Sequence, residues 1–210
     1  MSPFTLDFMR ISRLFVFFFV ACPFLTVAQE AQISSHFGIK AGPSLTRLSV
    51  SGITPNIPKQ KIDYHLGGMY RFRYNRFVIQ PEVLYSAKGG TFQAVKVGGK
   101  ETTKNNYAYV SVPLLLGYIP TEGITLQIGP EFSYALNSGT ATGPGQRNDI
   151  GLVVGAHYDF LDMLDKFSLH VRYVYGLNNV ARPSDPALAV DYRNRVLQLS
   201  MVYNFYKKKK

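Results

Sequence analysis

Cysteine and tryptophan are almost missing from this chain, whose 210 residues include one cysteine, Cys22, and no tryptophan. A single cysteine excludes an internal disulfide framework and a zinc site built from cysteines. Acidic residues are also few, 13 Asp and Glu against 23 Lys and Arg, which leaves a formal net charge of +10. Apart from Lys207 to Lys210, the basic residues are scattered. Scattered charge favours contact with anionic lipid headgroups and argues against a nucleic-acid partner.

Long hydrophobic runs are missing as well. The longest apolar stretch, Leu14 to Leu25, is too short to cross a bilayer comfortably as a helix. Arg10 and Arg13 precede it, and small residues ending at Ala28 follow it. This order of basic residues, apolar core and small residues predicts a secretory signal peptide over residues 1–28.

The predicted signal peptide includes Cys22, so the mature chain would have no cysteine. Two alternatives stay open at this point, an uncleaved membrane anchor and lipidation at Cys22. The remaining sequence contains neither a linker nor a low-complexity tract, which predicts one domain over residues 29–206. Residues 207–210 then form a basic tail.

A helical period of 3.6 residues is also missing after the signal peptide, and period-two alternation occurs in its place. In the segment ITLQIGPEFSYAL, Ile124 to Leu136, large apolar residues alternate with polar or small ones. Eight such stretches occur, and each has about the length of a tilted membrane strand. They are approximately His36–Leu45, Asp63–Arg73, Phe77–Gly90, Tyr107–Tyr118, Ile124–Leu136, Asp149–Phe160, Phe167–Leu177 and Arg193–Tyr206.

The connections between these stretches alternate between short and long. The short ones are Arg73–Arg76, Ile119–Gly123 and Leu161–Asp165. The long ones are Thr46–Ile62, Phe92–Asn106, Asn137–Asn148 and Asn178–Tyr192. Antiparallel strands in chain order would place all long loops at one end, as in bacterial outer-membrane barrels, with both termini at the short-turn, periplasmic end. The predicted fold class is therefore all-β: an eight-stranded antiparallel up-and-down transmembrane β-barrel.

The two faces of the strands differ in a way that suits lipid outside and polar groups inside. Each apolar set has aliphatic residues in the middle and tyrosine or phenylalanine toward an end, which is typical of the aromatic girdles of membrane barrels. We therefore expect Leu126, Ile128 and Phe132 to face lipid and Glu131 to face the lumen.

The polar sets predict a lumen filled by side chains, since an eight-stranded barrel is narrow. The expected polar network consists of Lys40, Arg71, Glu82, Glu131, Asp159 and Arg172. Proline lacks the N–H group that an interior strand uses, so strand prolines are expected at bulges or at strand ends near the interface. These prolines are Pro43, Pro81, Pro113 and Pro130.

Four blocks of the sequence resemble the PorT-like outer-membrane β-barrel proteins of Bacteroidetes. The blocks are FGIKAGPSLTRL (37–48), VIQPEVLYSAKGG (78–90), YVSVPLLLGY (109–118) and LQIGPEFSYAL (126–136). The family motifs correspond to Gly38, Lys40 and Gly42; Gln80, Pro81, Glu82, Tyr85 and Ser86; Val112, Pro113, Leu114 and Leu115; and Gly129, Pro130 and Ser133. The resemblance spans essentially the whole mature chain.

This resemblance implies a location in the cell outer membrane, contact with its lipid and insertion by the barrel-assembly machinery. One branch of the family is associated with a protein-secretion system, whereas most members have no assigned activity. A secretion-system or other envelope protein is thus an expected kind of partner. Unlike strands that end at an aromatic residue, the last strand continues into four lysines after Phe205 and Tyr206.

Sequence support for an enzyme is missing. The chain has four histidines, His36, His65, His157 and His170. None shares a short motif with a serine and a carboxylate, and their spacing is unlike that of a metal site. We therefore predict no catalytic residue, no metal and no cofactor. Glu82 and Glu131 are interpreted as partners of interior cations rather than as a general acid and base.

Function is then expected in the long loops, since loops on a rigid scaffold commonly carry binding specificity. Their basic residues form a predicted rim of Lys59, Lys61, Lys96, Lys100, Lys104 and Arg182. The favoured hypothesis is a non-enzymatic membrane scaffold whose loops contact a partner protein or an anionic surface glycan. One alternative is a soluble, lipocalin-like carrier with its apolar residues inside. A more distant alternative is an enzyme that modifies outer-leaflet lipids.

Overall fold

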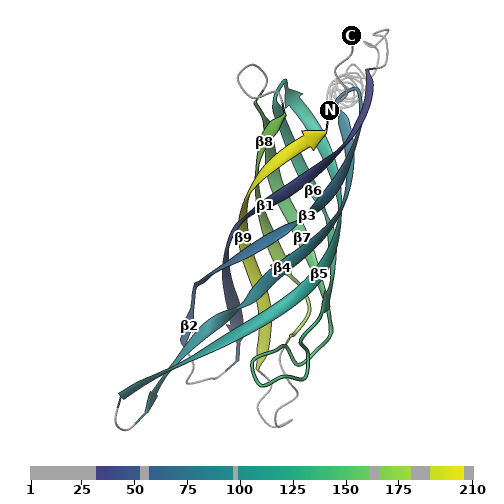
Figure 1. The fold of residues 1–210 in the computed structure, drawn as a ribbon. Coiled ribbons are helices and arrows are strands. Elements are labelled where there is room, and N and C mark those ends of the chain that lie inside the picture. Colours follow the sequence, from purple (N-terminus) through teal and green to yellow (C-terminus); the bar gives the residue numbers. More distant parts are fainter. Residues whose placement is uncertain (1–31, 53–56, 97–98, 161–165, 181–189, 206–210) are drawn as a thin grey trace, which may run out of the picture. The chain divides into compact units, whose positions relative to one another are not determined.

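The computed structural model describes residues 32–52, 57–96, 99–160, 166–180 and 190–205 (Figure 1). The predicted signal peptide, the lysine tail, the short connection at 161–165 and Arg182 lie outside these residues. Within the described part of the chain, no helix is long and apolar enough to cross a membrane.

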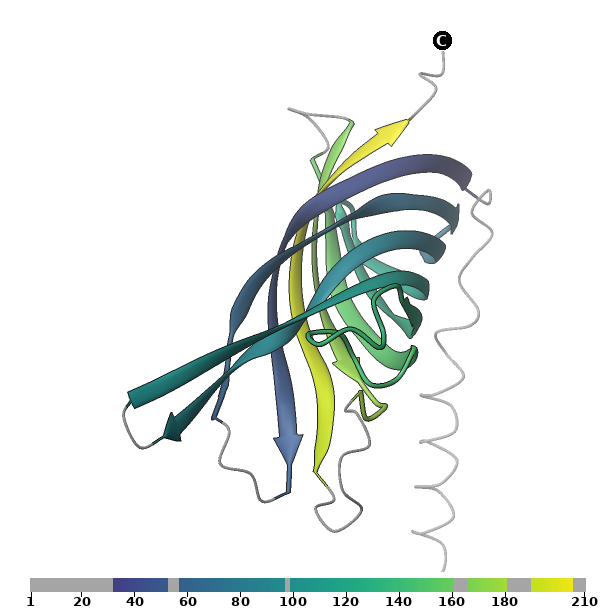
Figure 2. The same ribbon diagram turned by 60° about the horizontal axis from the view of Figure 1, so that its bottom comes forward.

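The described residues contain nine β-strands, all in one antiparallel sheet. They are β1 (Ile33–Ser51), β2 (Ile57–Lys59), β3 (Lys61–Tyr74), β4 (Phe77–Lys96), β5 (Gly99–Thr121), β6 (Ile124–Ala135), β7 (Asn148–Asp159), β8 (Phe167–Gly176) and β9 (Asp191–Phe205). The sheet order is β2-β4-β3-β1-β9-β8-β7-β6-β5, and a further pairing of β4 with β5 closes the sheet into a ring (Figure 2). The prediction of an all-β, antiparallel, up-and-down closed sheet is confirmed.

The strand count differs from the expected eight because of the short strand β2, which the sequence reading placed in a loop. β2 pairs only with β4, in the register Ile57↔Gln93 to Lys59↔Thr91. This register is offset by one residue from that of β3 with β4, and Gln60 lies between β2 and β3. Gln60 is therefore the extra residue of a β-bulge. Before this bulge Lys59 pairs directly with Thr91, so the two side chains lie on the same face.

The two ends of the ring differ as the loop lengths predict. The start of β1 lies beside the end of β9, in the register Phe37↔Phe205. At this short-turn end, Asn75–Arg76 joins β3 to β4 and Glu122–Gly123 joins β5 to β6. Gly123 has a φ of 82°, which favours glycine. The described β6–β7 connection, residues 136–147, lies at the opposite end of the ring, which is called the long-loop end (Figure 1).

The expected loop Phe92–Asn106 is wrong, since this segment is a continuation of β4 and β5. The two strands stay in register out to Val95↔Lys100 and Lys96↔Gly99. The glycines and lysines of this stretch suggested a loop, but its Thr, Val, Phe and Gln residues suit an extended pair. The result is a hairpin that projects from the ring at the long-loop end (Figures 1 and 2).

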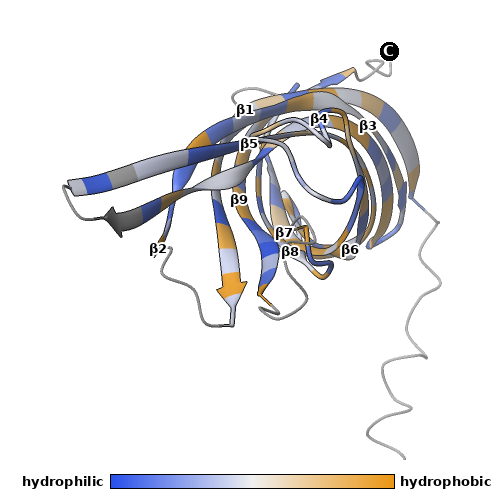
Figure 3. Ribbon diagram, turned by 90° about the horizontal axis from the view of Figure 1, so that it is seen from below, coloured by the Kyte–Doolittle hydropathy of each residue, from blue (hydrophilic) through white to orange (hydrophobic). Residues whose placement is uncertain are grey.

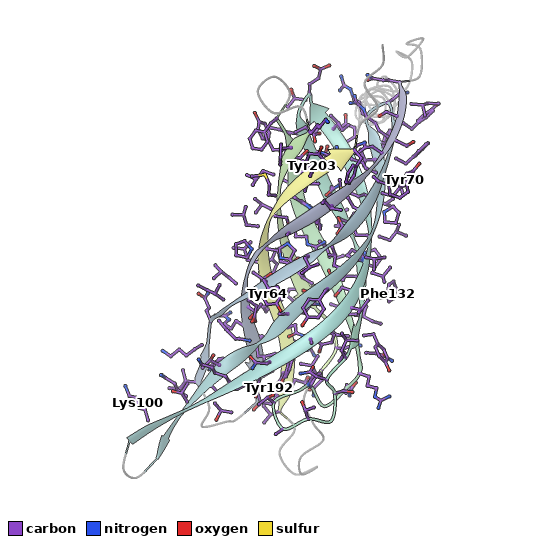
Figure 4. All side chains as sticks on the ribbon, in the orientation of Figure 1. Tyr64, Tyr70, Lys100, Phe132, Tyr192 and Tyr203 are labelled. Carbon is purple, nitrogen blue, oxygen red and sulfur yellow. The ribbon has the colours of Figure 1, made fainter. Side chains whose placement is uncertain are left out.

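Hydrophobic and hydrophilic residues alternate along the strands (Figure 3), and side chains project outward all around the ring (Figure 4). Most large apolar side chains are exposed on the outside, and several charged ones are buried. Ile128 and Phe132 are 51% and 54% exposed, whereas Glu131 between them is 1% exposed. Outward aromatic pairs such as Phe37–Tyr70, Phe77–Tyr118 and Phe167–Tyr203 lie toward the short-turn end. A fold that exposes its apolar residues and buries its charged ones needs lipid outside.

The expectation that the strand prolines sit at bulges or strand ends is wrong. Pro43 pairs with Tyr64 in an unbroken β1–β3 register, while the β1–β9 pairing skips from Ala41 to Ser44 without a register shift. Each of the other three prolines likewise lies in a gap of the pairing with one neighbouring strand and is paired with the strand on its other side. A missing N–H removes a hydrogen bond on one side only, so the ring accommodates each proline by a local gap.

Two adjacent glycines in β3 allow a matched test of backbone spacing. A Cβ at Gly67 would lie 2.1 Å from the carbonyl oxygen of Val83, whereas one at Gly68 would meet only the oxygen of Gly38, at 3.8 Å. We expect Gly67→Ala to lower the free energy of unfolding by about 1–3 kcal/mol, because β3 and β4 must separate. Gly68→Ala should be neutral, as measured by urea unfolding in lipid vesicles; equal effects would contradict the spacing argument.

Candidate functional site

The centre of the lumen holds a buried cluster of charged residues from different strands. Glu82 of β4 accepts two charge-assisted hydrogen bonds on its Oε2 atom: from Lys40 Nζ of β1 at 2.6 Å and from Arg172 Nη1 of β8 at 2.8 Å. All three side chains are fully buried. Such a pair of cations around one carboxylate is stable only while every partner is present, because an uncompensated buried charge is costly.

The cluster continues to a second carboxylate. Lys88 Nζ donates to Glu131 Oε1 at 2.7 Å and to Ser133 Oγ at 2.9 Å. Arg172 Nη2 lies 3.7 Å from Glu131 Oε2, so the guanidinium stands between the two carboxylates. Three cations thus face two carboxylates inside the ring.

Amide side chains supply further hydrogen bonds to this central cluster. Gln80 Nε2 donates to Glu82 Oε1 at 2.8 Å, and Arg172 Nε donates to Gln198 Oε1. Gln198 Nε2 in turn donates to Ser86 Oγ at 3.2 Å. Because the partners come from β1, β4, β6, β8 and β9, the cluster crosslinks opposite walls of the ring, and such connected polar networks rigidify their surroundings.

A second polar group lies toward the short-turn end, around Asp159. Arg71 Nη2 is 3.5 Å from Asp159 Oδ2, and His157 Nε2 is 3.1 Å from Asp159 Oδ1. Ser168 Oγ donates to the same Oδ1 atom at 2.6 Å. The six predicted network residues therefore divide into two groups: Arg71 and Asp159 here, and Lys40, Glu82, Glu131 and Arg172 in the central cluster.

The geometry around the histidines differs from a serine–histidine–acid relay. In such a relay the serine hydroxyl is hydrogen-bonded to the histidine, and the histidine is hydrogen-bonded to the acid. Here Ser168 and His157 instead both bind the carboxylate of Asp159. His65 lies between Ser44 Oγ at 2.8 Å and Ser200 Oγ at 2.6 Å. Within the described ranges, no group of three or more His, Cys, Asp or Glu side chains is arranged to hold a metal.

Lys88 is the main member of the central cluster that sequence reasoning missed. Lys88 lies an even number of residues from Gln80 and Glu82, so all three side chains point to the same face of β4. This alternation is the signal that identifies Lys88 as inward-facing. Its buried ammonium also lies 5.0 Å from the centre of the Tyr109 ring.

An apolar group that the sequence reading also missed fills the long-loop end of the lumen. It comprises the buried residues Leu48, Phe92, Tyr107, Tyr109, Ala135 and Val180, with Val50 and Tyr192 against it. The β6–β7 connection covers this group, since Asn106 N donates to Thr142 O and Gly145 N donates to Val180 O. The described lumen thus carries charged clusters in its centre and toward the short-turn end and is apolar beneath the long loops. A second buried apolar cluster, Leu115, Val153, Val174 and Val196, lines part of its wall.

The predicted basic rim lies mostly in strands rather than loops. Lys59 is in β2, Lys61 begins β3, Lys96 ends β4, and Lys100 and Lys104 are in β5; Arg182 lies outside the described residues. Lys61 binds Asp63 at 2.7 Å, so it belongs to the mouth of the ring. The register Lys59↔Thr91↔Lys104 places Lys59 and Lys104 on one face of the projecting hairpin, and Lys100 shares that face by parity (Figure 4).

Several solved outer-membrane proteins are similar to this chain. OprG from Pseudomonas aeruginosa is 16% identical, with a TM-score of 0.51, over 83% of this chain and 97% of that chain. Ail of Yersinia pestis is 15% identical, with a TM-score of 0.45, over 82% of this chain and 99% of that chain. Neisserial surface protein A is 14% identical, with a TM-score of 0.46, over 82% and 99% of the two chains. Comparison with curated proteins finds no match.

The sequence also matches a family model described as the outer membrane protein beta-barrel domain, over residues 27–182. This match covers most of the chain and agrees with a closed antiparallel sheet that is apolar outside and charged inside. The chain therefore belongs to the outer membrane protein beta-barrel domain family and lies in the lipid bilayer of the outer membrane.

Proposed function

We propose that this protein is a non-enzymatic outer-membrane barrel that binds an envelope partner protein through its projecting hairpin. The eight strands that pair around the ring span the membrane, β2 remains outside it, and the lumen is closed to solutes. The soluble lipocalin-like alternative is wrong, because it requires the large apolar residues inside, and they face outward.

The projecting hairpin is the observation that carries the partner-binding proposal. Beyond the ring, β5 pairs with β6 only from Tyr109 onward, so the segment Gly99–Asn105 is paired with β4 alone among the described strands. Its other edge presents backbone donors and acceptors for an added strand, a recognised mode of protein binding. The outward lysines Lys59, Lys100 and Lys104 favour an acidic partner segment.

Photo-crosslinking in intact cells tests this proposal. A crosslinking residue at Thr102, in the open edge segment, is expected to capture a partner protein, whereas the same residue at Glu122, in a short turn, should not. Thr102 is exposed and outward-facing, so the substitution leaves the ring intact. Captures from Glu122 alone would place the function in the periplasm and overturn the proposal.

A closed lumen is supported by the packing of all three lumen regions. From the short-turn end to the long-loop end, the lumen contains the Asp159 group, the central charge cluster and the apolar group under the long loops. We expect planar-bilayer recordings of the purified protein to show no stable porin-sized conductance, because side chains fill the narrow lumen of an eight-stranded barrel. Stable conductance steps at low applied voltage would contradict a filled lumen.

A subunit-like role in secretion or envelope assembly is the finer form of the proposal. It rests on the PorT-like blocks that include Lys40, Glu82 and Pro113, and it requires insertion by the barrel-assembly machinery. The central cluster supports a rigid scaffold for such a role, since Lys40 and Glu82 tie β1 to β4 across the lumen.

A further inference from the structure

Two arginines stand directly opposite each other on the outer face of the ring. Arg47 of β1 pairs with Arg195 of β9, and both belong to the outward-facing set of their strands. The preceding outward pair is Leu45↔Leu197, in which each side chain is 42% exposed on the lipid-facing surface. The arginines are thus the first outward pair beyond the lipid-facing residues, toward the long-loop end.

The guanidinium of Arg195 is held in place by its neighbours. It lies 3.4 Å from the ring centre of Tyr175, the residue opposite it on β8. Its Nη1 atom donates to Gly176 O at 2.7 Å and to Asn194 O at 3.0 Å. Among the described residues its hydrogen bonds use Nη1 only, which leaves Nε and Nη2 for a ligand at the surface.

This cation pair has no counter-charge among the described side chains. Like charges directly opposite each other in a sheet repel and destabilise the pair. None of the ion pairs within the described ranges includes Arg47 or Arg195, whereas the nearby Arg193 binds Asp191 at 3.2 Å. An anion from outside the chain would relieve the repulsion.

We propose that Arg47 and Arg195 bind the phosphate group of a lipid in the outer leaflet around the barrel. Planar guanidinium groups bind phosphate through paired hydrogen bonds, and Tyr175 is the kind of residue found at the headgroup level. A lipid is the occupant because the pair directly adjoins Leu45 and Leu197, which would contact its acyl chains. This site is separate from the projecting hairpin and goes beyond the proposed function.

Native mass spectrometry of the folded protein in detergent tests the site, with phosphatidic acid as the probe. We expect Arg47→Gln/Arg195→Gln to weaken phosphatidic acid binding by about fivefold for each arginine removed. The control, Arg76→Gln/Arg147→Gln, removes two exposed arginines elsewhere and should bind as the wild type does.

Two results would overturn the assignment. One is unchanged affinity of the double variant; the other is an equal loss in the control, which would indicate nonspecific attraction. Inorganic phosphate is expected to bind at least tenfold more weakly than phosphatidic acid, because it lacks the acyl chains; equal binding would exclude a lipid site. If heat-modifiable gel mobility shows that the double variant does not fold, Arg47→Gln alone, at an exposed side chain, should still lose about fivefold.

Discussion

Glu82→Gln is expected to destabilise the folded barrel by about 3–5 kcal/mol, because the amide cannot balance the two cations that share this carboxylate. Lys40 Nζ and Arg172 Nη1 lie 2.6 and 2.8 Å from Glu82 Oε2, and all three side chains are fully buried. The substitution preserves the size of the side chain, so the loss measures charge rather than packing. Urea unfolding in lipid vesicles, followed by heat-modifiable gel mobility, would measure it.

Glu122→Gln provides the matched control, since Glu122 is exposed in the β5–β6 turn. We expect that variant to unfold at the wild-type urea concentration. Adding Lys40→Met to Glu82→Gln removes one of the two unbalanced cations and should recover part of the lost stability. A Glu82→Gln protein as stable as the control would show that the central cluster contributes little to the fold.

Ile128→Arg is expected to destabilise the inserted barrel by about 2–4 kcal/mol, the cost of an arginine near the bilayer midplane on a lipid-facing strand. Ile128 is outward and 51% exposed, and it lies in the middle of β6 between aliphatic neighbours on β5 and β7, Leu116 and Val154. The measurement is again the free energy of unfolding from vesicles.

The comparison for Ile128 is Ile62→Arg, at a residue that is 75% exposed at the long-loop end of β3. There the added guanidinium reaches the headgroups, so the expected cost is about 0–1 kcal/mol. Depth dependence is therefore the diagnostic result. Equal costs at Ile128 and Ile62 would contradict the depth dependence.

Much of the fold follows from the alternation of residues along the chain. In β6, the alternation places Leu126, Ile128 and Phe132 on the lipid face and Glu131 in the lumen, and the exposures in the structure agree. Parity is a local property, because successive side chains in a strand point to opposite faces whatever the strand pairs with. The same rule includes Lys88 with Glu82, and Lys88 lies inside the expected strand Phe77–Gly90, although the predicted network does not include it.

The pairing of charges was beyond the sequence. Arg71 and Arg172 are both inward-facing by parity, yet Arg71 binds Asp159 and Arg172 binds Glu82. Which cation meets which carboxylate depends on the stagger between strands that are far apart in sequence. The hairpin at Phe92–Asn106 was missed for a related reason, since its extension depends on β4 and β5 pairing with each other beyond the ring.

The sequence by itself determined eight of the strands in outline, their two faces, the end of the ring that carries the short turns and the location in the outer membrane, because period-two patterning and turn residues act over a few neighbours. Only the tertiary structure decided the partners of Glu82, the apolar group beneath the long loops, the projecting hairpin and the meeting of Arg47 with Arg195. Closing the ring sets the register between β1 and β9, at opposite ends of the chain, and contacts across that seam depend on the stagger of the whole sheet.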